Sequence, residues 1–135
     1  MTKIAVFASG NGSNLQALID AIGRRDLSAE IKLVVCDRPG AFAITRALKA
    51  RLEVLAFNPK EYASKAAYEE IISKKLAQLE IEYLVLAGYM RIIGPTLLNK
   101  YTQRIINIHP SLLPLFPGKD GVGQALRAGV TETGV

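Results

Sequence analysis

Short apolar runs, each too brief for a helix, recur along the chain and alternate with amphipathic helical patterns. The runs are KIAVFAS, IKLVVCD, EVLAFN, YLVLAGY and RIINIHP, which we predict to be strands. Near-continuous apolar strands are typical of a parallel sheet covered on both faces, because both sets of alternating side chains are then buried. The pattern therefore predicts a doubly wound α/β domain whose mostly parallel sheet is joined by right-handed crossovers.

Helical patterns fill the segments between these strands. The clearest is SKAAYEEIISKKLAQLE, whose apolar residues are predicted to share one buried face: Tyr68, Ile71, Ile72, Leu76 and Leu79. The other predicted helices are NLQALIDAIG, AFAITRALKA, the short GPTLLNKY with Pro95 at its start, and GVGQALRAG. With 135 residues, 50% of them hydrophobic, the chain fits a single domain over residues 1–135.

Charge and composition exclude several classes of partner. The net charge is +5, but the basic residues are scattered along the chain rather than clustered. Nucleic-acid binding usually needs a clustered basic patch, so small anionic substrates fit better. No apolar stretch approaches the roughly 20 residues of a membrane span, and no secretory cleavage pattern follows the amino terminus. We therefore expect a cytoplasmic protein with no nucleic-acid or membrane partner.

The single cysteine and the single histidine limit metal and nucleophile chemistry. Cys36 lies inside the apolar run IKLVVCD, where a small buried side chain is the expected role. One His and one Cys far apart in the chain do not form a metal site, so we expect no metal.

The loop after the first strand, SGNGSN, is the first candidate site, because ligands of doubly wound folds bind outside the carboxyl ends of strands. Gly10 and Gly12 permit a tight turn, Ser13 or Asn14 could cap the next helix, and the amides of a helix start bind phosphate. An ordinary glycine-rich turn is an equal alternative.

A dinucleotide site is disfavoured. The fingerprint would require a third glycine where Leu15 stands. Asp37, at the end of the second strand, could hold a ribose but could equally cap the next helix. NAD binding therefore ranks low.

The fourth predicted strand opens into LAGYMRIIGP. Free backbone groups together with Met90, Ile92 and Ile93 could hold a flat heterocycle there. Core packing is the simpler interpretation of these apolar residues, and a solvated surface charge is the simpler interpretation of Arg91.

The fifth predicted strand ends in INIHP. Strand alternation places Asn107 and His109 on one side, about 6.5 to 7 Å apart. An amide can donate to a developing oxyanion, and an imidazole can move a proton beside it, which suits transfer of an acyl-like group. The alternative is a hydrogen-bonded pair that merely closes a strand.

Three segments in order, SGNGSNLQALIDA, VLAGYMRII and IINIHPSLLPLFPG, make the chain resemble the glycinamide ribonucleotide formyltransferases. HPSLLP is shared by the wider family that uses formyltetrahydrofolate. The resemblance implies a Rossmann-like formyltransferase fold and transfer of a formyl group from 10-formyltetrahydrofolate to the amine of glycinamide ribonucleotide, without a metal. A homodimer is one possible assembly.

The resemblance also implies residue roles. The phosphate of glycinamide ribonucleotide would be bound by Gly12, Ser13 and Asn14. The folate site would contain Lys65, Met90, Arg91, Ile92, Ile93 and Asn107. Asn107 and His109 match the catalytic asparagine and histidine. Of the folate residues, Lys65 has an alternative interpretation, a solvated lysine at a helix start.

The family pattern continues past ETGV into a segment that carries a catalytic aspartate, which Asp120 does not match. We therefore expect a C-terminally incomplete domain, and little or no transferase activity from the 135-residue chain alone. Two alternatives to the transferase hypothesis stay open. One is a formyltetrahydrofolate hydrolase, which shares the Asn and His chemistry, and the other is a non-catalytic nucleotide- or phosphate-binding module.

Overall fold

The computed structural model describes residues 1–108 and the backbone of residues 130–132. The strands are β1 (Thr2–Ala8), β2 (Ala29–Cys36), β3 (Val54–Ala56), β4 (Tyr83–Leu86), β5 (Ile105–Ile108) and β6 (Val130–Glu132). The helices are α1 (Ser13–Gly23), α2 (Phe42–Lys49), the 3-10 helix η1 (Pro59–Glu61), α3 (Lys65–Gln78) and α4 (Pro95–Leu98). All of the predicted strands are present, while the helix expected over residues 121–129 lies outside the described residues.

The strands form one sheet in the order β3-β2-β1-β4-β5-β6. Strands β1 to β5 pair in parallel, whereas β6 pairs with β5 in the antiparallel direction. The predicted doubly wound, mostly parallel sheet is therefore confirmed. The order of the strands reverses between β1 and β4, so the loops that follow these two neighbours meet at the topological switch point.

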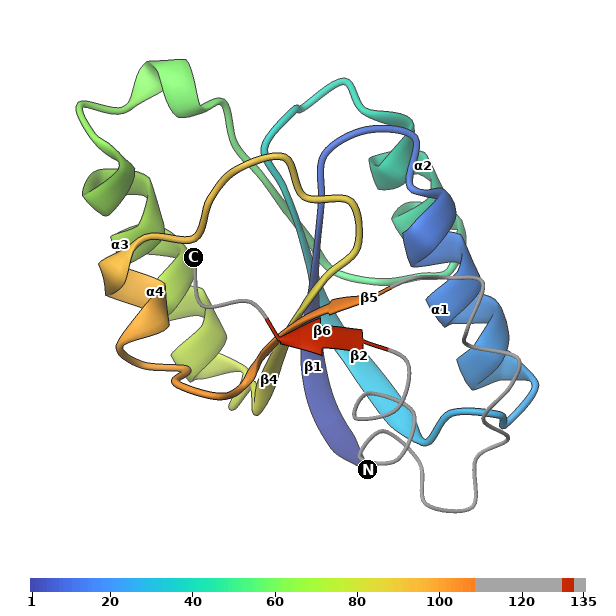
Figure 1. Ribbon diagram of the computed structural model, residues 1–135. Coiled ribbons are helices and arrows are strands. Elements are labelled where there is room, and N and C mark those ends of the chain that lie inside the picture. The colour runs from blue at the N-terminus through green and yellow to red at the C-terminus, as the bar shows by residue number, and fades with distance from the viewer. Residues whose placement is uncertain (109–129, 133–135) are drawn as a thin grey trace.

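Helices cover both faces of this sheet (Figure 1), with α1 and α2 on one face and α3 and α4 on the other. Strand β1 shows why both faces are needed. Ile4 and Val6 pack with α1 and α2, whereas Ala5 and Phe7 pack with α3 and α4, and all four are buried. A strand that is apolar on both sides loses this burial unless each face is covered.

The buried face of α3 differs from the prediction. Tyr68, Ile72 and Leu76 are buried as expected, but Ile71 is 46% exposed. Buried in its place is Glu69, which is 2% exposed and accepts a hydrogen bond from the backbone N–H of Gly94. Hydropathy alone places a glutamate in solvent, and only the partner on the adjacent loop reverses that preference.

No helix within the described ranges has the length and apolar character needed to cross a membrane.

Candidate functional site

The loop that follows β1 (residues 9–14, the β1 loop) opens helix α1 without a side-chain cap. Gly12 occupies the N-cap position with φ of 84°, in the left-handed region that glycine adopts readily. The prediction that Ser13 or Asn14 caps the helix is wrong, because the chain turns into the helix at Gly12 itself. The first amides of an α-helix have no intrahelical acceptor. The first turn of α1 contains no acidic residue that would compete for these amides, so the helix start suits an anion.

Helix α2 fixes the outer side of the β1 loop. The Ala43 N–H donates to the Gly10 carbonyl oxygen at 3.1 Å. A Cβ atom built on Gly12 would lie 2.7 Å from the Ala43 Cα, so the two backbones are in direct contact. Only glycine fits this approach, for a reason of packing as well as of backbone conformation.

The loop after β4 (residues 87–94, the β4 loop) presents apolar side chains to solvent. Met90 is 79% exposed and Ile92 is 63% exposed, whereas Ile93 is only 2% exposed and packs in the core with α3 and α4. The simpler interpretation, core packing, therefore holds for Ile93 alone. Exposed apolar side chains near a strand end offer a surface that an apolar ligand face can contact.

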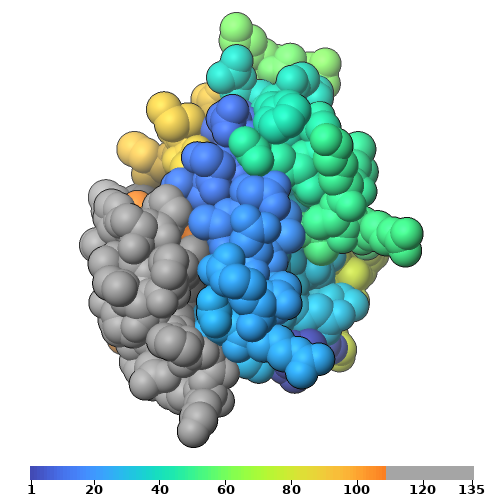
Figure 2. Space-filling view, turned by 90° about the vertical axis from the view of Figure 1, so that its right-hand side faces the viewer, coloured from blue at the N-terminus to red at the C-terminus, as the bar shows by residue number. Residues whose placement is uncertain are grey.

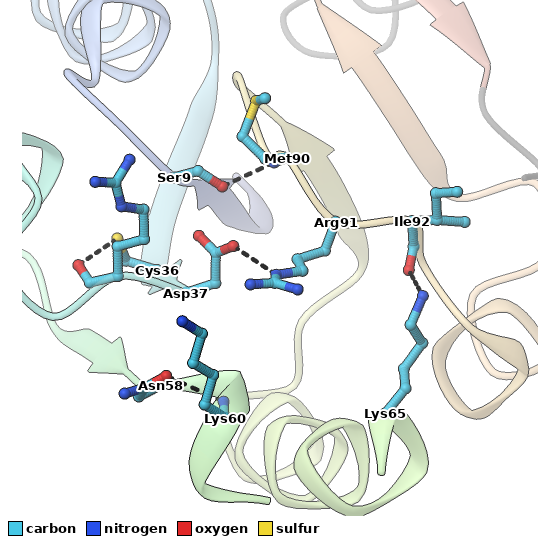
Figure 3. A network of polar contacts seen from close by, with 10 residues as sticks. Ser9, Cys36, Asp37, Asn58, Lys60, Lys65, Met90, Arg91 and Ile92 are labelled. Carbon is cyan, nitrogen blue, oxygen red and sulfur yellow. Dashed lines mark hydrogen bonds and ion pairs between the residues drawn. The ribbon is translucent and has the colours of Figure 1, made fainter.

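The β4 loop lies against the β1 loop. The Ser9 hydroxyl oxygen accepts a hydrogen bond from the Met90 N–H at 2.7 Å (Figure 3). A Cβ atom on Gly88 would lie 3.8 Å from the side-chain nitrogen Nδ2 of Asn14. The two predicted binding segments therefore share one edge of the sheet, as the switch point requires.

An ion pair ties the β4 loop to the end of β2. The Arg91 Nε donates to Asp37 Oδ2 at 3.0 Å, and the Asp37 side chain is only 2% exposed. The other Asp37 oxygen is buried and has no partner within the described residues. Asp37 does not cap α2, whose N-cap is Ala41, and Arg91 is not a free surface charge as the simpler interpretation held. A cavity of about 460 Å³ lies beside this pair and is also lined by Arg38 and Lys60.

Two residues one turn apart on α3 hold the far end of the β4 loop. The Lys65 Nζ donates to the Ile92 carbonyl oxygen at 2.6 Å, and Glu69 Oε2 accepts from the Gly94 N–H at 2.8 Å. Burial raises the pKa of the Glu69 carboxyl group, although the hydrogen bond from Gly94 and the charge of Lys65 oppose the shift. Lys65 was predicted to contact folate. It binds the β4 loop, the segment predicted to contact the folate.

Asn107 lies on β5, between Leu86 of β4 and Thr131 of β6. Ile106 and Ile108 pack in the core with α1 and α2, so strand alternation turns Asn107 toward the opposite face, where its side chain is exposed. The predicted alternation is confirmed for these residues. His109 lies outside the described residues, and its convergence with Asn107 stays a prediction.

Cys36 is fully buried and free, as predicted. Burial raises the pKa of its thiol, which therefore stays protonated and makes a poor nucleophile. No group of three or more His, Cys, Asp or Glu side chains that could hold a metal ion occurs in residues 1–108.

Two of the contacts that shape the site were missed by the sequence analysis. Ser9 directly follows β1, and its place beside the glycine turn was a usable signal. Glu69 offered no signal, since it stands among charged residues of an amphipathic helix.

Together these features define a doubly wound α/β protein with a candidate ligand site at its switch point, made of an amide-rich turn, an apolar loop and a strand-end amide. The family model described as formyl transferase matches residues 2–135. The chain belongs to the formyl transferase family, a family of enzymes.

Named relatives agree with this family. Phosphoribosylglycinamide formyltransferase of Bacillus subtilis is 53% identical over 135 residues, which cover all of this chain and 69% of the relative. The trifunctional purine biosynthetic protein adenosine-3 of Drosophila pseudoobscura is 42% identical over 134 residues, which cover 98% of this chain and 10% of that protein. The crystal structure of glycinamide ribonucleotide transformylase 1 from Geobacillus kaustophilus superposes with a TM-score of 0.79 at 56% identity, covering 97% of this chain and 70% of that one.

Proposed function

We propose that the site in this chain serves transfer of the formyl group of 10-formyltetrahydrofolate to the amine of glycinamide ribonucleotide, a step of purine biosynthesis in the cytoplasm, with turnover expected only when the chain is continued past Val135. The meeting of the β1 and β4 loops carries the proposal. An amide-rich helix start suits a phosphate, exposed Met90 and Ile92 suit a flat heterocycle, and the Gly88–Asn14 approach brings both surfaces to one edge. The relatives named above support the same reaction.

The β1 loop binds the nucleotide in this proposal. The N–H groups of Gly12, Ser13 and Asn14 donate to the phosphate oxygens, and the positive end of the α1 dipole adds to the attraction. Because the charge is recognised by backbone groups at a fixed turn, the phosphate also orients the amine at the other end of the substrate.

The β4 loop binds the folate. Met90 and Ile92 pack against the heterocycle, and backbone groups of residues 90–93 pair with its polar edge. Ile93 anchors the loop from the core, while Lys65 and Arg91 hold its shape through Ile92 and Asp37. A loop that is already held in place loses less entropy when the ligand binds.

The chemical step is a direct displacement at the formyl carbon. The lone pair of the substrate amine attacks that carbon, and the carbonyl electrons move to oxygen to form a tetrahedral oxyanion. Asn107 Nδ2 and His109 donate hydrogen bonds to this oxyanion. The carbon–nitrogen bond to folate then breaks, a proton passes from the attacking amine to the departing folate nitrogen with the help of His109, and the carbonyl re-forms.

The test uses two proteins: the 135-residue chain, and a hybrid chain continued past Val135 with the remaining residues of the Bacillus subtilis relative. Formation of tetrahydrofolate is followed by absorbance, and formylated nucleotide and free formate are measured as products. The hybrid chain is expected to make one formylated nucleotide for each folate consumed. Stoichiometric formate without formylated nucleotide would identify a hydrolase instead, and ligand binding without turnover would identify a binding module.

Substitutions separate catalysis from binding in the hybrid chain. Asn107→Ala is expected to lower kcat by about 10²- to 10³-fold, the usual effect of losing one oxyanion donor, with both substrates still bound. Asn99→Ala is the matched control, because Asn99 is also exposed but follows α4. Equal activities of the two variants would contradict the assigned role of Asn107.

A further inference from the structure

Arg46 of α2 donates hydrogen bonds to the β1 loop, on the side of the loop that faces α2. The Arg46 Nε donates to the Asn11 carbonyl oxygen at 2.9 Å, and Nη2 donates to the Asn11 side-chain oxygen at 2.8 Å. One planar guanidinium thus donates to both the backbone and the side chain of a single loop residue. Two hydrogen bonds from one rigid plane form a fork, which fixes the orientation of Asn11 as well as its distance from Arg46.

The same guanidinium also reaches helix α1. Its Nη1 donates to Gln16 Oε1 at 3.3 Å, and its carbon lies 4.8 Å from the centre of the Phe42 ring. All three nitrogens of Arg46 are therefore engaged, and the aromatic ring limits how the side chain can turn. Arg46 connects the loop, the first turn of α1 and helix α2.

Helix α2 brings the loop close enough for this contact. Ala43 and Arg46 stand three residues apart, on neighbouring positions of the α2 surface. Ala43 touches Gly12 and bonds to Gly10, while Arg46 bonds to Asn11. Figure 2 shows α1 and α2 side by side on this face of the molecule.

The bond to the Asn11 carbonyl acts directly on a predicted phosphate donor. The C=O of Asn11 and the N–H of Gly12 belong to the same peptide unit. A charged donor on that carbonyl oxygen polarises the unit and makes the Gly12 N–H a stronger donor on the opposite side, because linked hydrogen bonds reinforce one another. The bond also fixes the plane of this peptide, and with it the direction in which the N–H points.

We propose that Arg46 is a positioning residue for the phosphate of glycinamide ribonucleotide. It does not touch the phosphate. It orients and polarises the Asn11–Gly12 peptide from behind and places a positive charge behind the anion site. This inference rests on the proposed function, in which Gly12, Ser13 and Asn14 bind that phosphate.

Three variants of the hybrid chain test the inference. Arg46→Met removes the fork and the charge, Arg46→Lys keeps the charge without the fork, and Lys49→Met removes an equal charge from the same helix away from the loop. Arg46→Met is expected to raise KM for glycinamide ribonucleotide about tenfold, the scale of a lost charge-assisted hydrogen bond. KM for 10-formyltetrahydrofolate and kcat are expected to stay within about twofold. Arg46→Lys should fall between Arg46→Met and the unsubstituted chain.

Two results would overturn the inference. One is a KM for glycinamide ribonucleotide in Arg46→Met equal to that in Lys49→Met. The other is a parallel change of both KM values, kcat and the free energy of unfolding, because Arg46 would then only support the fold.

A separate readout keeps this result distinct from failure of the proposed function. Inorganic phosphate is titrated into the 135-residue chain while the amide resonances of residues 10–16 are followed by NMR. The Gly12 resonance is expected to move in the unsubstituted chain and in Lys49→Met, and to move much less in Arg46→Met. If the hybrid chain does not formylate the nucleotide, the proposed function is wrong. This titration then decides the role of Arg46, and equal shifts in all variants would contradict it.

Discussion

The β1 and β4 loops follow neighbouring parallel strands and meet at one edge of the sheet, yet they are built in different ways. The β1 loop presents backbone amides and depends on a glycine that touches α2. The β4 loop presents Met90 and Ile92 to solvent, and side chains from three other parts of the fold bind its backbone and Arg91: Ser9, Asp37, Lys65 and Glu69. Both loops therefore depend on distant partners, but the contacts on the backbone turn of the β1 loop come from one neighbouring helix, α2, whereas those on the β4 loop come from three parts of the fold.

The largest effect is expected at the support of the β4 loop. Glu69→Ala leaves the buried Gly94 N–H without an acceptor and opens space beneath the loop. The free energy of unfolding in urea is expected to fall by about 2 to 3 kcal/mol. Glu70→Ala is the control, because Glu70 is exposed on the same helix and should change stability by less than about 0.5 kcal/mol. Similar stabilities of the two variants would show that the loop does not depend on this distant carboxylate.

A loss of comparable size is expected in the β1 loop. Gly12→Ala places a side chain in the left-handed region and 2.7 Å from the Ala43 Cα. The backbone conformation alone costs about 1 to 2 kcal/mol, and displacement from α2 should also abolish binding of phosphate esters. Gly10→Ala is the stability control, since a Cβ there meets nothing within 4 Å. If Gly12→Ala unfolds at the same urea concentration as Gly10→Ala, contact with α2 does not determine this loop.

The pH dependence of stability sharpens the same contrast. Burial raises the pKa of Glu69 above its ordinary value of 4.5. Between the two pKa values the folded chain binds more protons than the unfolded chain, so this group lowers the free energy of unfolding as pH rises through that window. Glu69→Gln removes this contribution. Its stability relative to the unsubstituted chain should therefore increase as pH rises above about 4.5 in urea unfolding experiments. If the stability of Glu69→Gln relative to the unsubstituted chain fell as pH rose, the pKa of Glu69 would be lowered in the folded chain rather than raised.

The smallest stability effect is expected for Lys65→Met. Lys65 is exposed, and its bond to the Ile92 carbonyl competes with water, so the free energy of unfolding should change by about 0.5 kcal/mol. Folate affinity, measured by titration of the hybrid chain, should fall more clearly, because the loop loses one of its supports. Lys74→Met, elsewhere on α3, provides the matched loss of charge. Unchanged folate affinity in Lys65→Met would show that the other contacts suffice to hold the β4 loop.

The sequence by itself determined the strands, the layers and the position of the site. Apolar runs of strand length that alternate with amphipathic helices fit a parallel sheet with helices on both faces, so their order along the chain already placed the carboxyl ends of β1, β4 and β5 at one edge. The glycine turn before α1 and the alternation along β5 were equally readable, because both are local features of the chain. Strand β6 was not predicted, since three residues give too little periodicity to recognise.

Tertiary structure alone decided which side chains hold the site in shape. On α3, Glu69 is buried and Ile71 is exposed, the reverse of expectation, and the buried Glu69 accepts a hydrogen bond from the Gly94 N–H of the β4 loop. Arg46, an ordinary basic residue in sequence, becomes part of the β1 loop because α2 packs against it. A hydrogen-bond partner 25 or 35 residues away leaves no periodic trace in the chain. The free energy of such a contact depends on a distance that exists only after the elements have packed.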